Sequence, residues 1–220
     1  MISDTRPATL TDETFSKGLG DLCKNDPDLA RICARMDPPS TWARKPGFAS
    51  LVYIILEQQV SLASAKAAYD RLQKAILRVT PGRFLELDDA ALKAIGFSRQ
   101  KTAYGRNLAE AIVAGSLDLD GLNLLDDKTA RSELTGIKGI GPWTANIYLL
   151  TALRRPDIWP KEDLALAAAV QEIKRLPSRP VPSELDALGA HWKPWRSVAA
   201  RLLWHYYLGK GSAGSGKSGK

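Results

Sequence analysis

Two glycines that flank a single isoleucine, Gly139-Ile140-Gly141, lie within the stretch LTGIKGIGPWTANIYLL at residues 134–150. Glycine has no Cβ, so a phosphate could come within hydrogen-bonding distance of the backbone N–H groups at such a turn. Pro142 suits the first turn of a helix, and the dipole at a helix N-terminus favours an anion. The carbonyl groups on the preceding side would point together and could hold a monovalent cation. The stretch therefore predicts a sequence-independent grip on a phosphate backbone. An ordinary helix–helix turn with a glycine cap is the alternative, because G-x-G alone is a weak signal.

An acidic residue, Asp163, stands at the start of the strongly helical stretch DLALAAAVQEIKRL, which stops at Pro177. Aspartate is preferred at a helix N-cap because its side-chain oxygen accepts a hydrogen bond from an N–H group of the first turn. On these residues alone, Asp163 is therefore a helix N-cap, which is a common structural role.

Helical periodicity runs through most of the chain, and no alternating strand pattern of useful length is present. The segment at 47–60 is apolar nearly all round, which is typical of a core helix, and Ser61 is a candidate N-cap for the next helix. We therefore expect an all-α protein with many short helices in two lobes. The predicted helices cover residues 26–36, 47–60, 61–79, 88–95, 98–115, 127–134, 142–150, 163–176, 182–190 and 193–209.

Size and composition limit the class of protein. A chain of 220 residues with 45% hydrophobic content fits one large domain or two small ones that share a core. No apolar run reaches the length of a membrane span and the N-terminus lacks a signal-peptide core, so we expect a soluble intracellular protein. Cys23 and Cys33 are assigned to one helix. Two thiols cannot form a four-thiolate metal cluster, and a disulfide is not expected in a reducing compartment.

The net charge of the chain is +7, and the last stretch, GKGSAGSGKSGK at 209–220, contributes three lysines and no acid, which leaves +4 for the rest. A charge of +4 permits a polyanionic partner without requiring one. This tail is rich in glycine and serine, so we expect it to be disordered.

Several motifs together resemble the 3-methyladenine DNA glycosylase II branch of the helix-hairpin-helix DNA glycosylase superfamily. The resemblance rests on LTGIKGIGPWTAN, on PDIWPKEDLALAAAV, on PPSTWARKPGFASLVYIILEQQVSLASAKAAYDRL, on GFSRQKTAYGRNLA and on HWKPWRSVAARLLWHYY. It covers residues 25–208 and leaves an N-terminal extension at 1–24 and the tail at 209–220. It implies two helical lobes with a DNA-binding cleft between them, and this chain is too short for the N-terminal β-domain of larger members.

The resemblance places the family's catalytic aspartate at Asp163. Cleavage of an N-glycosidic bond builds positive charge on the sugar, and a fixed carboxylate can stabilise that charge or steer a water molecule. A helix N-terminus keeps such an acid ionised, although burial acts in the opposite direction. The neighbouring Glu162 is the wrong choice, because one step along a helix turns a side chain by about 100°.

Trp143 occupies the hairpin position where lyase-competent relatives carry a lysine nucleophile. An indole cannot form a Schiff base, so the resemblance implies a monofunctional enzyme that leaves an abasic site. The lack of a C-terminal cysteine cluster also argues against the endonuclease III branch.

The resemblance further assigns an aromatic pocket for the extruded base. Alkylated purines carry positive charge, which attracts them to aromatic faces. Trp204 would stack on the base and Trp143 would line the pocket, with Tyr53 and Trp159 as weaker candidates for its wall. The alternative is that these residues are core aromatics at helical spacing.

The resemblance assigns Gln59, in EQQVS, as the wedge that fills the gap left by the extruded base. Its alternative role is a surface residue at a helix end. Glu57 departs from the family, in which a small residue precedes Q-Q-V-S, and a carboxylate there would repel phosphate unless it turns inward or pairs.

The remaining implied contacts lie at the hairpin. Gly139, Gly141 and Thr144 would bind the DNA backbone. No cofactor is required, but a structural Na⁺ or K⁺ could be held by the backbone carbonyls of Thr135, Ile137 and Ile140.

The sequence thus favours a monomeric enzyme that excises alkylated bases such as 3-methyladenine and 7-methylguanine from double-stranded DNA. It would work in the cytoplasm near the nucleoid, or in the nucleus of a eukaryote. A non-catalytic helix-hairpin-helix DNA-binding module would need neither Asp163 nor an aromatic pocket. A glycosylase for mismatched or oxidised bases would differ only in pocket chemistry.

Overall fold

The computed structural model describes the backbone of residues 7–40 and 44–214 and the side chains of residues 7–40 and 44–209. These residues form helices, turns and loops without a strand, so the all-α prediction is confirmed. The chain divides into two compact units, which we call unit 1 (chiefly residues 43–153) and unit 2 (residues 8–42 and 154–220). Every helix among the described residues is too short or too polar to span a bilayer.

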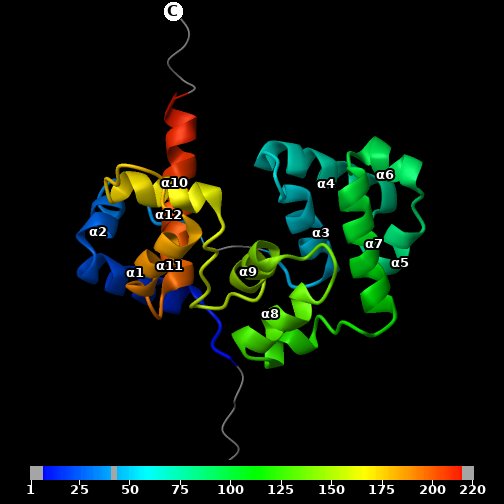
Figure 1. Ribbon diagram of the computed structural model, residues 1–220, viewed down its shortest axis with the longest axis horizontal. Coiled ribbons are helices and arrows are strands. Elements are labelled where there is room, and N and C mark those ends of the chain that lie inside the picture. Colours follow the sequence, from blue (N-terminus) through cyan, green and yellow to red (C-terminus); the bar gives the residue numbers. More distant parts are fainter. Residues whose placement is uncertain (1–6, 41–43, 215–220) are drawn as a thin grey trace, which may run out of the picture. The chain divides into compact units, whose positions relative to one another are not determined.

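Unit 1 is built around one apolar helix (Figure 1). Its elements are α3 (Phe48–Glu57), α4 (Leu62–Ile76), α5 (Pro81–Leu85), α6 (Asp89–Ile95), α7 (Arg99–Val113), the 3-10 turn η1 (Gly121–Leu124), α8 (Asp127–Thr135) and α9 (Pro142–Thr151). Helices α4, α7 and α9 all pack against α3, in which Leu51, Val52, Ile54 and Ile55 have no exposed surface. The apolar character of this segment on all sides therefore reflects burial on all sides, as the sequence predicts.

Helix α3 ends earlier than predicted. Gln58 leaves the helical region with a ψ of 121°, and Gln59 has a φ of 55° in the left-handed region. Ser61 caps α4 as predicted, because its hydroxyl accepts a hydrogen bond from the Ser64 N–H at 3.2 Å. Residues 58–61 consequently form a short loop, here called the α3–α4 loop, in which residues 59–61 are exposed.

Unit 2 contains α1 (Asp12–Asn25), α2 (Pro27–Cys33), α10 (Leu164–Ile173), α11 (Pro182–Ala190) and α12 (Arg196–Gly214). Helix α1 lies within the segment that the sequence assigned only as an extension. Thr11 and Thr14 form a reciprocal cap at its start, and its buried Phe15 and Leu22 belong to a face that packs on α2 and α12. Residues 12–24 are therefore an integral part of the core of unit 2.

Helix α12 continues to Gly214 and so takes in residues 209–214 of the Gly/Ser-rich segment for which disorder was predicted. The remaining residues of that segment, 215–220, lie outside the described residues.

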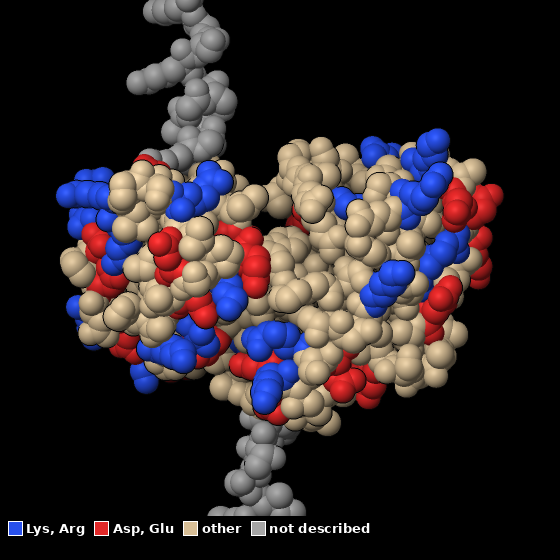
Figure 2. Space-filling view, in the orientation of Figure 1, with Lys and Arg blue, Asp and Glu red and all other residues tan. Residues whose placement is uncertain are grey.

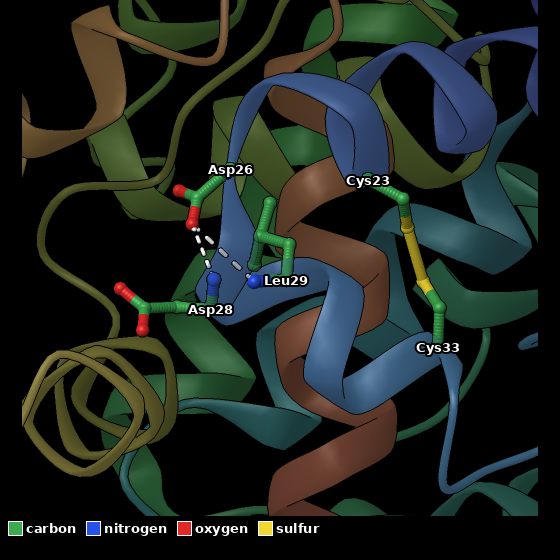
Figure 3. The surroundings of a disulfide bond; sticks show 5 residues. All are labelled: Cys23, Asp26, Asp28, Leu29 and Cys33. Atoms are coloured by element: carbon green, nitrogen blue, oxygen red, sulfur yellow. Dashed lines mark hydrogen bonds between the residues drawn. A yellow bond between two sulfur atoms is a disulfide. The ribbon is translucent and has the colours of Figure 1, made fainter.

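The two cysteines lie in two helices rather than one. Asp26 ends α1 and Pro27 begins α2, so the chain turns back between them. Figure 3 shows the disulfide between Cys23 and Cys33, which joins α1 to α2. The prediction that no disulfide forms is wrong for this structure, because the turn brings together two side chains that a single helix would have kept apart.

The carboxylate of Asp26, at that turn, connects the start of α2 to residues much later in the chain of unit 2. It accepts hydrogen bonds from the Asp28 and Leu29 N–H groups (Figure 3) and from Trp192 Nε1 at 2.8 Å, and Lys174 Nζ donates to its Oδ1 at 2.9 Å and its Oδ2 at 2.8 Å. Burial alone would raise the pKa of this carboxyl, but the bonds from Lys174 and Trp192 outweigh burial and lower the pKa below its ordinary value.

We expect Asp26→Ala to lower the free energy of unfolding by about 2–3 kcal/mol at pH 7, because it removes the acceptor of the buried Trp192 indole N–H and one of the two carboxylates paired with the Lys174 ammonium. Urea denaturation measures this difference. A carboxyl with a lowered folded-state pKa stabilises the protein above its unfolded pKa, so the difference should shrink as the pH falls below about 4. The exposed Glu13→Ala is the control and should change stability by less than about 0.5 kcal/mol. An equal effect of both variants would contradict this role of Asp26.

Candidate functional site

The turn between α8 and α9 is the place where the sequence predicts a phosphate-binding hairpin. The Ile140 N–H donates to the Ile137 carbonyl at 2.9 Å. The Ile140 side chain is only 3% exposed, so it packs in the core and anchors the turn there. Helix α9 then begins with Pro142, after Gly141, and no side chain caps it. Because the N-cap Gly141 supplies no capping side chain, an anion such as a phosphate could bind at the N-terminus of α9.

The structure gives the two glycines different roles, although the sequence analysis assigned them the same one. Gly139 has a φ of 108°, and a Cβ there would overlap the ring of Tyr104 on α7. Gly141 has an ordinary φ of −84°, is exposed, and has no atom within 4 Å of the position of a Cβ. Gly139 is therefore required by the fold, whereas Gly141 leaves open the approach to the N–H groups of α9.

We expect Gly141→Val to weaken binding to every DNA duplex by about tenfold or more, because the side chain blocks close approach of a charged acceptor to the backbone. Its melting temperature should stay near that of the parent, since nothing in the protein occupies that space. Gly139→Val should instead unfold more easily, owing to strain at positive φ and the clash with Tyr104. Fluorescence anisotropy and thermal melting distinguish the two effects. Equal affinity of Gly141→Val and the parent for duplex DNA would rule out the hairpin as the phosphate grip.

Thr144 lies in the first turn of α9 but does not expose its side chain. It is 2% exposed, and its Oγ1 accepts a hydrogen bond from Gln58 Nε2 at 2.9 Å. Its backbone N–H is thus the group through which the predicted DNA contact would be made.

Asp163 is the N-cap of α10, as the sequence predicts, and it has a second partner that the sequence did not reveal. Its Oδ1 accepts a hydrogen bond from the Leu166 N–H at 2.7 Å and another from Trp204 Nε1 at 3.0 Å. Both Asp163 and Trp204 are half-buried, and Glu162 beside them is exposed. Two donors on one oxygen fix the orientation of the carboxylate next to an indole ring.

The other predicted aromatics differ in their surroundings. Trp143 is half-buried in the first turn of α9. The ring of Tyr53 stacks on Tyr69 with centroids 4.7 Å apart, and the Arg44 guanidinium lies 4.9 Å from the centroid of Tyr53. The surroundings of Tyr53 are thus occupied by the protein itself, and the geometry favours a supporting role over direct stacking on a base.

Trp159 lies in the core of unit 2. It is 5% exposed, donates to the Leu185 carbonyl at 2.9 Å and meets Trp192 edge-to-face, and a side chain at Gly189 would overlap it. These contacts favour packing over a place in the wall of a base pocket. Trp192 itself, bonded to Asp26, is also a packing residue.

Glu57 does not present its charge to solvent. It is 9% exposed and forms two hydrogen bonds with the Arg44 guanidinium, at 2.6 and 3.1 Å. The departure from the family motif is therefore neutralised locally, by pairing. Gln59, two residues later, is exposed at the tip of the α3–α4 loop, where a wedge would have to be.

The carbonyl groups of Thr135, Ile137 and Ile140 are hard oxygen donors, which suit Na⁺ or K⁺. The Ile137 carbonyl already accepts the Ile140 N–H, which leaves it one lone pair for an ion. Within the described residues, no group of histidine, cysteine, aspartate and glutamate side chains is arranged to hold a metal. The monovalent cation remains a prediction.

Surface charge is mixed on the face shown in Figure 2, where Lys and Arg lie among Asp and Glu on each unit. A positive field is thus not the main feature of this face. Specific donors such as the hairpin N–H groups would have to contribute strongly to a backbone contact.

The sequence of this chain is similar to those of known DNA repair proteins. Residues 52–195 match the profile of a family described as HhH-GPD superfamily base excision DNA repair protein. The chain is 27% identical over 190 residues to DNA-3-methyladenine glycosylase 1 of Schizosaccharomyces pombe, covering 84% of this chain and 83% of that protein. It is 29% identical over 169 residues to the DNA-3-methyladenine glycosylase of Bacillus subtilis, where it covers 71% of this chain but only 56% of the relative.

A solved structure is similar over most of the chain. The Schizosaccharomyces pombe 3-methyladenine DNA glycosylase Mag1, in complex with abasic DNA, superposes with a TM-score of 0.80 and 25% sequence identity. The match covers 86% of this chain and 95% of that one.

Proposed function

Because the chain belongs to the HhH-GPD superfamily of base excision DNA repair proteins, we propose that it extrudes alkylated bases from double-stranded DNA and hydrolyses their N-glycosidic bonds. The observation that carries this proposal is the carboxylate of Asp163, oriented by Leu166 and Trp204 at the start of α10. A protein that only bound the DNA backbone would not need a charged group there, because an asparagine could cap α10 and accept the same hydrogen bonds. The names of its relatives, and the DNA held by the similar Mag1 structure, support the same conclusion.

The site suits bases that leave readily. A purine alkylated at N3 or N7 carries positive charge and is attracted to an aromatic face. Trp204 donates from the edge of its indole to Asp163, so a base stacked on that ring would bring its glycosidic carbon near the carboxylate. As the bond breaks, positive charge grows on the sugar, and a preoriented carboxylate stabilises it or steers the attacking water.

Trp143 supports a monofunctional reaction. Formation of a Schiff base needs an amine, and the first turn of α9 carries an indole at this place. We expect the product strand to stay intact until alkali is added, and no covalent adduct to form with borohydride. Denaturing gel electrophoresis measures both, and nicking without alkali together with a trapped adduct would contradict this role of Trp143. Trp143→Lys should not become an efficient lyase, because the amine would also need correct placement.

The remaining features of the proposed enzyme follow from the same resemblance. It would act as a monomer in the compartment that holds the cell's DNA and would need no cofactor. A Na⁺ or K⁺ ion at the carbonyls of Thr135, Ile137 and Ile140 would reinforce the hairpin, in which the amide N–H groups of α9 contact the phosphate.

The substrate class can be tested with a panel of duplexes. Duplexes that each carry one lesion, either 3-methyladenine or 7-methylguanine as alkylated bases or 8-oxoguanine or a mismatched uracil for comparison, are incubated with the protein and the free bases are separated by chromatography. Release of the alkylated bases in preference to the others is the expected result. Preferential release of an oxidised or mismatched base would contradict the proposed substrate class.

A further inference from the structure

The end of α3, immediately before Gln59, is anchored to other elements of unit 1. At Leu56 the backbone carbonyl accepts a hydrogen bond from Lys101 Nζ on α7 at 2.7 Å. At Glu57 the buried carboxylate is paired with Arg44, which lies just before α3. Burial lowers the pKa of Lys101, which is consistent with an ammonium drawn into the protein rather than exposed to DNA.

The next residue, Gln58, connects the α3–α4 loop to the hairpin. Its Nε2 donates one hydrogen bond to the Gly139 carbonyl at 3.1 Å and one to Thr144 Oγ1 at 2.9 Å. A side-chain amide nitrogen has two hydrogens, so its donor capacity is fully used. One acceptor belongs to the turn and the other to the first turn of α9, and the amide thus spans the two parts of the anion-binding hairpin.

Gln59 follows directly, and its environment differs from that of Gln58. It is exposed, its φ of 55° lies in the left-handed region, and its side chain forms no hydrogen bond with another described residue. A non-glycine residue in that region costs energy and persists when its surroundings fix it. The surroundings here are the anchored residues that precede it.

We propose that Gln58 is a positioning residue that holds the wedge, Gln59, at a set distance from the phosphate-binding N–H groups of the hairpin, so that wedge and hairpin move as one rigid body when a base is extruded. This inference rests on the proposed function. Extrusion loses the stacking and pairing of the base, and the wedge compensates for that loss most fully if it enters the gap without first having to be ordered. A loop that is already ordered pays less on binding.

Gln58→Met is the matched test, because methionine keeps the length and bulk of glutamine but has no donor. Extrusion is read from the fluorescence of 2-aminopurine placed beside a lesion with a poor leaving group, on protein that also carries Asp163→Asn so that excision is slow during the measurement. Excision is read separately in single-turnover assays of protein with Asp163 intact. We expect the extruded fraction and the excision rate each to fall about tenfold, because the two hydrogen bonds by which Gln58 positions the wedge are lost. Affinity for undamaged duplex should change by less than about twofold, since the hairpin N–H groups remain.

Variants of Thr144 test the same hydrogen bond from the acceptor side. Thr144→Val removes one of the two acceptors and should reduce extrusion by about threefold, whereas Thr144→Ser keeps the hydroxyl and should restore it. The double variant Gln58→Met, Thr144→Val should be no worse than Gln58→Met alone, because both remove the same hydrogen bond.

The outcomes separate this inference from the proposed function. A parent protein that neither extrudes nor releases a base contradicts the proposed function. A parent that does both, with Gln58→Met unchanged in extrusion, overturns the positioning role alone. A parallel fall of extrusion, duplex affinity and melting temperature in Gln58→Met would also overturn it, because the residue would then serve only the fold.

Discussion

Replacing Asp163 by asparagine should slow excision of a lesion with a poor leaving group by about 10²–10³-fold, the usual cost of losing one preorganised electrostatic group. Folding should change little, because asparagine caps helices about as well as aspartate. The amide oxygen of asparagine can still accept from the Leu166 N–H and from Trp204 Nε1, so only the charge is lost. A cationic lesion such as 7-methylguanine should be less affected, because its glycosidic bond is already labile. Single-turnover kinetics on matched duplexes measure these rates.

Binding of lesion DNA should survive in Asp163→Asn or become tighter, because an anion that repels phosphate has been removed. Glu162→Gln is the matched control, since Glu162 is exposed and adjacent in sequence. It should be nearly neutral. Loss of activity in Glu162→Gln with retention in Asp163→Asn would show that the catalytic assignment is displaced by one residue.

Trp204→Ala should reduce excision by about 10²-fold or more, because it removes both the proposed stacking surface for the base and a donor to the carboxylate of Asp163. Trp204→Phe keeps an aromatic face and loses the donor, so its rate should fall by about tenfold. The difference between the two variants separates stacking from orientation of Asp163. The comparison uses single-turnover rates, measured with each variant in excess over the lesion duplex and at a concentration above the Kd of that variant for the duplex.

Tyr207→Ala is the control for these changes, because Tyr207 is an exposed aromatic on the same helix, α12. It should excise at nearly the parental rate. Parental excision by Trp204→Ala would mean that Trp204 is only a packing residue, and the aromatic pocket would have to be sought elsewhere.

Local patterns predicted the features of this fold that depend on neighbouring residues. The apolar segment of α3, the cap at Ser61 and the N-cap at Asp163 were all foreseen, because each depends on residues within one or two helical turns. The turn between α8 and α9 could be predicted for the same reason, whereas its role in binding phosphate was inferred from its glycines and from the resemblance. Helix α1 was not predicted, although the Thr11–Thr14 cap is a local signal that could have revealed it.

Contacts between distant residues could not be predicted from spacing. Gln58 meets Gly139 across 81 positions, and Trp204 meets Asp163 across 41. The same limit applies to Gly139, since nothing in the sequence shows that Tyr104 packs against it. The pairing of Glu57 was raised only as one way to tolerate its charge, and Arg44 as its partner emerged from the structure.

The most direct test of the account is release of free bases from methylated duplex DNA by the parent protein and by Asp163→Asn, each shown to bind that DNA. The parent should release 3-methyladenine and 7-methylguanine faster than they depart spontaneously, and should leave intact strands that alkali then cleaves. Asp163→Asn should release 3-methyladenine far more slowly at equal occupancy. If the parent binds the methylated duplex but releases neither base above the spontaneous rate, the protein is a DNA-binding module and the account is contradicted.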